Sequence, residues 1–263
     1  MSLIDPLLLN ARLASAAGRF DVDALSECDS TNAELMRRAD RGAPSGSVIV
    51  ADRQTAGRGR RGRSWLSSPE SSLTFSVLWR FTGPLNRLSG LSLAVGVALA
   101  RALGSLGARG VRLKWPNDVL LVQAGEFAKL AGVLVELSTD RRGAQAIIGI
   151  GLNLAPPPGD TGQPAAGLEQ AVDAMPDRHE VLAAILRELQ AVLDIFTVDG
   201  FFGVKMAWQE FNAWAGLPLA VSDGGAVLQT GICIGVDDEG ALLLDTGAGI
   251  APVMVGDVSL RRL

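Results

Sequence analysis

Arginines and glycines alternate in one short segment of the chain, from Gly57 to Arg63, and Trp65 follows it closely. Glycine lets the backbone approach a ligand, while arginine offers a planar set of donors that matches phosphate and carboxylate groups. The segment can therefore clamp a small anion; a nucleic-acid contact and a solvated loop are the alternatives. Its predicted position between two core strands, with an indole available to stack on a planar ring, favours a lid over a small molecule.

Two further segments place polar or charged side chains at the ends of predicted strands. In Lys114-Trp115-Pro116-Asn117-Asp118, proline restricts the preceding tryptophan to an extended conformation and Asn-Asp favours a turn. Polar groups are thus held where ligands commonly bind, although these residues taken alone are more typical of an ordinary turn. Lys129 begins an apolar segment. Its ammonium could be held at a binding site, but a lone lysine more typically lies with its aliphatic chain along the surface and its charge in water.

Composition limits the chemistry that these residues can perform. The 263 residues include one histidine, His179, and no tyrosine. Zinc sites built on several histidines are excluded, and so are Ser-His triads that use any other histidine. The net charge of −4 argues against a nucleic acid as partner of the whole surface. Catalysis must then depend on arginine, lysine, amides and carboxylates.

The sequence also predicts a cytoplasmic protein that does not interact with a membrane. The longest segment without a charged residue, 143–159, contains Asn153 and three consecutive prolines, which is not typical of a membrane span. Asp5 and Arg12 interrupt what would be the apolar part of a signal peptide. Two cysteines make a poor disulfide framework, so a reducing compartment is expected.

The predicted elements place these segments around one sheet. Apolar alternation or short apolar runs predict strands, and apolar residues at helical spacing predict helices. Strands are expected before Ser30 and at 47–52, 72–81, 111–115, 119–123, 129–137 and 144–154, and helices from Thr31 onward and at 88–106, 180–196 and 202–215. Thr31 and Glu34 have the spacing of a capping box. Short connections between strands favour antiparallel pairing, so the predicted class is α+β rather than doubly wound.

Three parts are expected along the chain. Residues 1–19 suggest a short helix at most, because a winged helix-turn-helix needs roughly 60 residues. Residues 20–215 contain the sheet, its helices and the three chemical segments. Residues 216–263 consist of short β-rich runs separated by glycine turns, which suggests a small five-stranded barrel.

Five motifs occur in the order and spacing found in biotin protein ligases. They are Ser30-Thr31-Asn32, Gln54 with the loop 57–62, and the segments 114–118, 129–132 and 149–153. From about residue 20 onward the chain resembles the short class of this family, which lacks an N-terminal winged helix. The resemblance implies a class II synthetase-like biotin/lipoate ligase catalytic fold, with a mixed, largely antiparallel sheet and helices, followed by an SH3-like C-terminal domain.

The resemblance also implies roles for individual residues. Lys129, Arg58 and Arg60 would be catalytic. The biotin site would contain Ser30, Thr31, Asn32, Gln54, Arg58, Gly59, Arg60 and Lys129. The ATP or adenylate site would contain Arg60, Arg63, Trp65, Asn117, Asp118 and Asn153. Among these, Trp65 and Asn153 would lie on the adenine side, and Asp118 would be linked to Mg²⁺.

The hairpin that leads to Lys129 departs from the family's pattern. The family commonly has a basic residue just before the catalytic lysine, whereas Gly125-Glu126-Phe127-Ala128 stands here. A different hairpin shape is therefore expected.

The implied reaction joins biotin to ATP as biotinyl-AMP and then transfers biotin to a lysine of a carrier. ATP and Mg²⁺ would be required. The acceptor would be the biotin carboxyl carrier domain of acetyl-CoA carboxylase or of another biotin-dependent carboxylase. No DNA partner is expected, and weak homodimer formation stays open. The alternatives are a lipoate or octanoate ligase of the same fold, a nucleic-acid-binding module that uses the arginine loop, and a non-catalytic biotin sensor.

Overall fold

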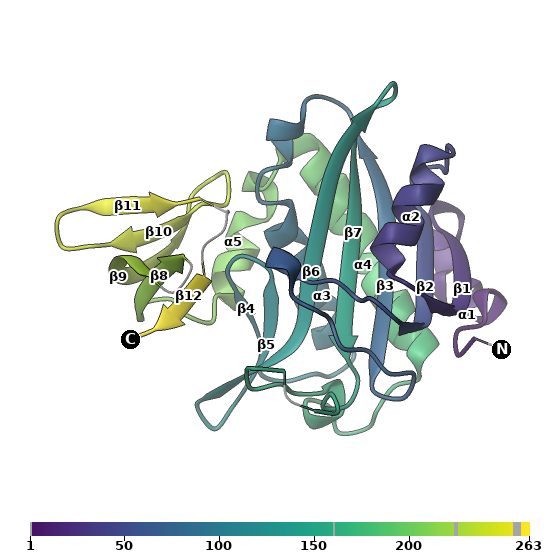
Figure 1. Ribbon diagram of the computed structural model, residues 1–263, viewed down its shortest axis with the longest axis horizontal. Helices are drawn as coiled ribbons and strands as arrows, with labels where there is room; N and C mark the ends of the chain where they lie inside the picture. Colours follow the sequence, from purple (N-terminus) through teal and green to yellow (C-terminus); the bar gives the residue numbers. More distant parts are fainter. Residues whose placement is uncertain (1, 160, 224–225, 255–258) are drawn as a thin grey trace.

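A seven-stranded mixed sheet forms the centre of the computed structural model, which describes residues 2–159, 161–223, 226–254 and 259–263. Its strands are ordered β1-β2-β3-β7-β6-β5-β4 (Figure 1). They are β1 (Asp21–Cys28), β2 (Ser47–Gln54), β3 (Ser72–Phe81), β4 (Val111–Lys114), β5 (Asp118–Gln123), β6 (Glu126–Asp140) and β7 (Gly143–Asn153). β1 and β2 pair in parallel and every other neighbouring pair is antiparallel, which confirms the predicted class.

Helices cover both faces of this sheet. They are α1 (Pro6–Leu13), α2 (Thr31–Asp40), α3 (Leu91–Ser105), α4 (Arg178–Asp199) and α5 (Phe202–Phe211). α3 and α4 pack together on one face, where Phe75 and Val77 of β3 point into the main core. α2 covers the other face with Leu35, which packs against Leu78. β3 is therefore buried on both sides, although its predicted alternation identified only one buried face.

α3 owes its apolar sequence to the core. The segment Leu85–Ser105 is long and apolar enough to cross a membrane by length and composition, but 72% of its most apolar window is buried inside the molecule. It contacts α4, α5 and strands β4, β5 and β6. A helix packed against protein over most of its surface is apolar on most sides, and the exposed Arg101 lies near its end.

The start of α2 differs from the sequence prediction. The helix begins at Thr31 after an extended Ser30, so the third helical residue is Ala33 and not Glu34. Alanine has no side-chain acceptor, and no capping box forms. Glu34 instead accepts from Arg37 and Arg38 one turn later, which leaves the Thr31 hydroxyl free to face the sheet.

An extra residue in β6 changes the face on which Lys129 lies. Val119 of β5 pairs with Ala131, whereas the next residue, Leu120, pairs with Lys129, so Leu130 is a β-bulge. Side chains in a regular strand alternate between faces, and a bulge shifts that alternation by one. Lys129 therefore shares a face with Gly132, where its ammonium lies, instead of pointing into the core with Ala131. β6 begins at Glu126, three residues earlier than predicted.

The hairpin before Lys129 is tight. Ala124 and Gly125 form a two-residue turn with φ values of 50° and 82°. Two consecutive positive φ values are typical of a primed turn that matches the twist of the flanking strands. The hairpin thus extends β5 and β6 by regular pairing up to Gln123 and Glu126.

A second sheet occupies the C-terminal end of the chain. Its order is β11-β10-β9-β8-β12, and it lies beside α5 and the start of α3 (Figure 1). Its strands are β8 (Pro218–Asp223), β9 (Ala226–Val236), β10 (Leu242–Asp245), β11 (Ile250–Val253) and β12 (Ser259–Arg262). The Trp115 indole donates to the Gly240 carbonyl at 2.9 Å, which ties this sheet to the end of β4. α5 ends at Phe211, earlier than predicted, because Asn212 forms a bridge with Leu113.

Candidate active site

A narrow cavity of about 50 Å³ opens where α2, the arginine-glycine loop and strands β6 and β7 meet. All eight residues predicted for a biotin site line it: Ser30, Thr31, Asn32, Gln54, Arg58, Gly59, Arg60 and Lys129. The remaining lining residues are Trp65, Asn117, Gly132, Val133, Leu134, Gly149, Ile150 and Gly151. The structure therefore brings together segments that are as far apart as residues 30 and 151.

A larger cleft of about 800 Å³ continues from this cavity toward the second sheet. All six residues predicted for an ATP site line it: Arg60, Arg63, Trp65, Asn117, Asp118 and Asn153. Gly59, Arg60, Trp65, Asn117 and Lys129 line both spaces, so they form the junction between them. β12 contributes Ser259, Leu260 and Arg261 to the cleft, a contribution that was not among the predicted site residues.

Hydrogen bonds connect the side chains at the inner end of the small cavity. The Ser76 hydroxyl lies 2.5 Å from Asn32 Oδ1 and 2.7 Å from Thr31 Oγ1. The Thr31 backbone N–H donates to Gln54 Oε1 at 2.8 Å. Ser30, Thr31, Asn32 and Ser76 are all buried, so this network is held away from bulk water. Ser76 was not among the predicted site residues. In a strand predicted from alternating apolar residues, it stands at one of the polar positions and carries no signal of its own.

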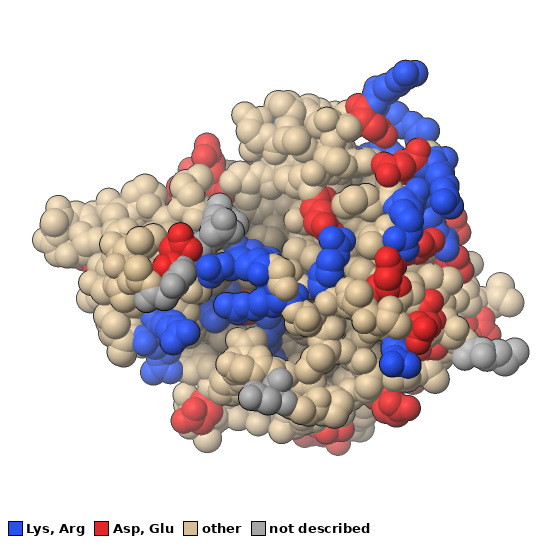
Figure 2. Space-filling view, viewed as in Figure 1, with Lys and Arg blue, Asp and Glu red and all other residues tan. Residues whose placement is uncertain are grey.

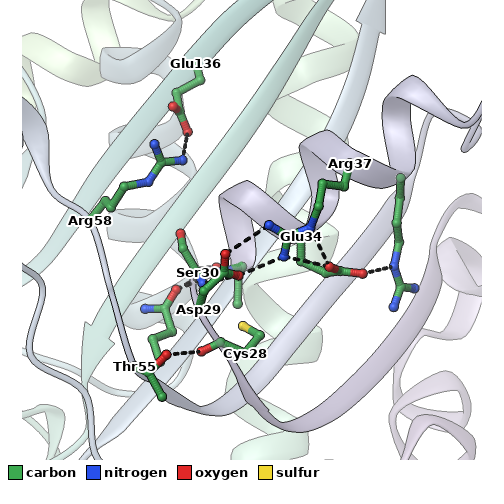
Figure 3. A network of polar contacts seen from close by, with 11 residues as sticks. Cys28, Asp29, Ser30, Glu34, Arg37, Thr55, Arg58 and Glu136 are labelled. Atoms are coloured by element: carbon green, nitrogen blue, oxygen red, sulfur yellow. Dashed lines mark hydrogen bonds and ion pairs between the residues drawn. The ribbon is translucent and has the colours of Figure 1, made fainter.

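A bidentate ion pair fixes the edge of the cavity at the start of α2. Figure 3 shows the Arg37 guanidinium against the Asp29 carboxylate, with both distances below 3.0 Å. These hydrogen bonds and the one from the Ser30 N–H lower the pKa of Asp29 to about 2. The neighbouring Cys28 is no candidate nucleophile, because burial and then the Asp29 charge raise the pKa of its thiol to about 11.

Two glycines make the space that Trp65 occupies. Gly132 of β6 pairs with Gly151 of β7, and the indole lies against both, so that a Cβ at Gly151 would overlap the ring. The Lys129 ammonium lies 5.6 Å from the centre of the same ring. Within the described part of the chain, the buried Trp65 Nε1–H has no hydrogen-bond acceptor. An unsatisfied buried donor is costly, so a ligand acceptor at this position would be favoured.

The positive charges at the junction are partly balanced by one carboxylate. Lys129 Nζ lies 2.6 Å from Asp118 Oδ1, and Lys114 Nζ lies 3.8 Å from Asp118 Oδ2. Burial lowers the pKa of Lys114 below its usual range, although the Asp118 charge opposes this shift. The Lys114 ammonium also lies 4.8 Å from the Trp214 ring. A polyanion that enters the cleft would meet two ammonium groups and several guanidinium groups.

Asn153 stabilises the backbone that surrounds the cleft. Its Nδ2 donates to the carbonyl oxygens of Lys129 and Ala166, at 3.2 and 3.1 Å. The amide thus joins the end of β7 to the start of β6 and to the segment after the proline-rich loop. Asn153 still lines the larger cleft, but its donors are used within the protein.

The arginine-glycine loop lies folded over the site. Gly59 N donates to Arg63 O at 2.7 Å, and Trp65 N donates to Gly57 O at 2.9 Å, so the loop is closed at its base. Arg58 reaches Glu136 at 3.2 Å and Arg60 reaches Asn117 Oδ1 at 3.1 Å. Figure 2 shows the resulting concentration of basic side chains across the middle of this face. These contacts attach the loop both to itself and to the strands beneath it.

The described residues fit Mg²⁺ only together with phosphate oxygens. They contain no group of three or more His, Cys, Asp or Glu side chains that could hold a metal ion. Asp118 is a single carboxylate beside two ammonium groups. Magnesium commonly binds one or two carboxylates plus the phosphates of a nucleotide, so Asp118 can supply one ligand to an ion that arrives on a nucleotide.

The absence of a side chain at Gly149 is required for the cavity network. A Cβ at this position would overlap the Asn32 amide oxygen. We expect Gly149→Ala to lower the free energy of unfolding by about 1–3 kcal/mol, as overpacking commonly does, and to weaken binding in the small cavity. Thermal unfolding and calorimetric titration with biotin measure the two effects. Gly104→Ala is the control, since among the described residues no atom outside its own stretch of helix lies within 4 Å of its added Cβ; an equal loss in both variants would contradict the prediction.

Comparisons with known proteins agree with this arrangement. The model of the Biotin/lipoate A/B protein ligase family matches residues 26–153, and that of the Biotin protein ligase C terminal domain matches residues 220–261. The bifunctional ligase/repressor BirA of Escherichia coli is 38% identical over 99% of this chain and 81% of its own length. A biotin--[acetyl-CoA-carboxylase] ligase of Paracoccus denitrificans is 36% identical over 89% of this chain and 98% of its own.

A solved structure is similar over nearly the whole chain. The biotin protein ligase from Aquifex aeolicus in complex with biotin and ATP superposes with a TM-score of 0.76 and 32% identity. The match covers 92% of this chain and 99% of the Aquifex chain. Both the central sheet and the second sheet therefore have counterparts in a protein that binds these two ligands.

Proposed function

This chain belongs to the biotin protein ligase family, and from that premise we propose how its residues carry out the reaction. It is an ATP-dependent ligase that joins biotin to AMP and then transfers biotin to a lysine of a biotin carboxyl carrier protein. The observation that carries the assignment of residues is the junction of two cavities at Arg60, Trp65, Asn117 and Lys129. The first family model covers biotin and lipoate ligases alike, but the C-terminal model and the relatives are biotin ligases.

The small cavity is our proposed biotin site. Its inner end carries the hydroxyl and amide groups of Ser30, Thr31, Asn32 and Gln54, which suit the polar ureido ring of the vitamin. Its walls at Val133, Leu134 and Ile150 suit the apolar chain. The carboxylate of biotin would then point toward Lys129 and the arginines of the loop, which are the cations at the outer end.

The larger cleft is our proposed site for ATP and for the adenylate. Its cations, Arg60, Arg63, Lys114 and Lys129, would hold the phosphates, and Trp65 would contact the adenine. Asn117 and Asp118 would help to place the α-phosphate near the junction. Asn153 supports this site mainly through its hydrogen bonds to the backbone at Lys129 and Ala166. Asp118 would be the protein ligand of Mg²⁺ that arrives with ATP, and the ion would neutralise phosphate charge.

The first step depends on charge at the junction rather than on an acid or a base. Biotin's carboxylate oxygen attacks the α-phosphorus, and pyrophosphate leaves with the bonding electron pair. Arg58, Arg60 and Lys129 would stabilise the two anions as they approach. In the second step the carrier lysine's neutral amine attacks the acyl carbon, AMP leaves, and the amine proton passes to solvent or to the departing phosphate.

The partner of this enzyme is a carrier protein of acetyl-CoA carboxylase, as the names of its relatives indicate. We propose further that the protein acts in the cytoplasm, which the free thiols of Cys28 and Cys233 support, and that it needs no DNA partner. We propose a domain division at residue 216, before the second sheet, with residues 1–19 as an N-terminal extension whose helix α1 packs against α4. Whether a weak homodimer forms is a question for sedimentation of the purified chain.

Lys114 offers a test of the cleft through stability. Burial disfavours the charged form of Lys114 and lowers its pKa in the folded protein. Below that lowered pKa the buried charge reduces the free energy of unfolding. This destabilisation disappears as pH rises from the lowered pKa toward 10.5, the ordinary lysine value. Lys114→Met removes the buried charge and keeps the length of the side chain. We expect the melting temperature to rise at neutral pH, by about 2–4 °C for each kcal/mol, and the KM for ATP to increase.

The comparison of Lys114→Met with the unsubstituted protein must be repeated at alkaline pH. The stability difference should shrink as the pH passes through the lowered pKa, because both proteins are then neutral at residue 114. Arg112→Met in the same strand is the control, since its exposed side chain lies outside the cleft. An unchanged KM for ATP in Lys114→Met would remove Lys114 from the proposed ATP site.

The central experiment incubates the purified protein with labelled biotin, ATP, Mg²⁺ and a biotin carboxyl carrier domain. We expect biotin-dependent exchange of pyrophosphate into ATP and one labelled carrier lysine. Omission of the carrier should leave the exchange intact, because the first step does not need it. A protein that binds biotin without exchange would be a sensor, and one that binds nucleic acid with strong salt dependence and no turnover would be a nucleic-acid module.

A further inference from the structure

Glu136 is a carboxylate beside the site that none of the proposed roles uses. It lies on β6, seven residues after Lys129 and beyond the bulge. Figure 3 shows Arg58 reaching from the loop toward it, and the two charged groups are 3.2 Å apart. The same oxygen, Glu136 Oε2, also accepts from Asn32 Nδ2 at 2.7 Å. One carboxylate therefore joins the loop to the start of α2.

Glu136 does not line the small cavity, but Arg58 and Asn32 both do. The side chain of Glu136 is 26% exposed and that of Arg58 is 46% exposed, so the ion pair lies at the border between protein and solvent. Its position behind the wall means that a ligand would contact Arg58 and Asn32 and not the carboxylate itself. Any influence of Glu136 on the reaction must act through these two side chains.

The carboxylate also determines how the Asn32 amide is oriented. An ionised carboxylate only accepts hydrogen bonds, so it requires the amide nitrogen of Asn32 to face it. The Leu134 carbonyl, 3.3 Å from the same nitrogen, has the same requirement. The amide oxygen must then face Ser76, whose hydroxyl is 2.5 Å away and also contacts Thr31. Glu136, the closer acceptor at 2.7 Å, and the Leu134 carbonyl thus together set the direction of the hydrogen bonds along the inner cavity.

We propose that Glu136 is a positioning residue that links closure of the arginine-glycine loop to the orientation of the biotin-contacting side chains. This inference rests on the proposed biotin site. With Arg58 held by Glu136, the loop lies over a cavity whose amide is already oriented. When the pair opens, the loop loses one of its attachments to the sheet and the cavity loses part of its preorganisation.

Glu136→Gln tests the proposal with little change in shape. The amide has no charge, but its oxygen can still accept from Arg58 and Asn32 at the position of Oε2, so the variant removes the charge and keeps the hydrogen-bond geometry. We expect the KM for biotin in pyrophosphate exchange to rise about three- to tenfold, in line with the loss of a charge-assisted hydrogen bond at a partly exposed site. The KM for ATP should stay within about twofold, because Glu136 does not line the larger cleft. Glu136→Asp, which retains the charge, should recover part of the loss.

A second readout does not depend on activity. The loop contains Arg58, Arg60, Arg61 and Arg63, and trypsin cleaves after arginine when a segment opens. We expect cleavage in this loop to be about three- to tenfold faster in Glu136→Gln than in the unsubstituted protein, without ligands. Asp140→Asn is the matched control, since Asp140 lies on the same strand and pairs with Arg80 but contacts no cavity residue.

The outcomes separate this proposal from the proposed function. If the unsubstituted protein shows no biotin-dependent exchange, the function fails, and the trypsin comparison still decides whether Glu136 holds the loop. If exchange is normal and Glu136→Gln matches Asp140→Asn in both the KM for biotin and the cleavage rate, the positioning role is overturned. Should Glu136→Gln unfold, Arg58→Gln breaks the same pair from the exposed side, and unchanged values there would overturn the proposal equally.

Discussion

Lys129→Ala should lower the rate of biotin-dependent pyrophosphate exchange by about 10²–10³-fold while the protein remains folded. At about 4 Å and an effective dielectric near 20, two unit negative charges repel by roughly 4 kcal/mol, and a cation between them offsets that cost. Lys129 lies at the junction of the two cavities, and its side chain is 18% exposed, so solvent screens its charge only in part. A factor of 10²–10³ corresponds to about 2.7–4 kcal/mol, the range found when one electrostatic contact to a transition state is removed.

The fold should tolerate the loss of Lys129, because Asp118 keeps Lys114 within 4 Å and opens onto a wide cleft. Circular dichroism and thermal unfolding measure this directly. Lys205→Ala provides a matched control, since Lys205 also pairs with an aspartate at 2.6 Å but lies on α5, outside the cleft. Normal exchange by a folded Lys129→Ala protein would contradict the charge argument.

Arg60→Gly should convert the enzyme into a source of free adenylate. Arg60 lines both cavities and its guanidinium donates to Asn117, so it connects the loop to the strand end beneath it. The acyl-phosphate anhydride is reactive toward water and amines, and closure over it protects it. We expect the release rate of biotinyl-AMP to rise about 10²-fold, as for loss of one or two hydrogen bonds to a charged group, and bystander lysines to become labelled.

Labelling of an unrelated protein such as serum albumin, added at the carrier's concentration, measures this escape. Exchange of pyrophosphate should persist, because Lys129 and Arg58 remain. Arg141→Gly serves as a control: it removes an exposed arginine from the β6–β7 turn, far from both cavities. If Arg60→Gly retains the adenylate as tightly as the unsubstituted protein and labels only the carrier, the loop is not a lid.

Much of the site could be predicted because its residues occur in short segments next to strands. Asn117 and Asp118 follow β4 within a few residues, and Thr31 starts a helix directly after β1, so sequence order nearly determines their positions. The arginine-glycine loop was recognisable from composition alone. Such local patterns survive folding because the strands that carry them are defined by their own apolar residues.

Features that depend on distant pairing could not be predicted in this way. The bulge at Leu130 is visible only once β5 and β6 are in register. Strict alternation counted back from Ala131 would place Lys129 on the core face, which is the wrong face. Ser76 acquires its role from contacts with residues more than 40 positions away. The capping box at Thr31 was wrong because helix starts shift by one residue without any clear signal in the sequence.

The single supernumerary residue in β6, Leu130, decides on which face of the sheet the Lys129 ammonium lies. If β6 kept Leu130 but paired with β5 without the bulge, Lys129 would move opposite Leu121, and its ammonium would turn toward Ala131, Val133 and the helices behind the sheet. Lengthening the outer hairpin at Ala124 and Gly125 would have no such effect, since added residues would extend the turn and leave Lys129 paired with Leu120. In related sequences, insertions and deletions should therefore accumulate at the hairpin tip and be absent from the three residues that follow Lys129.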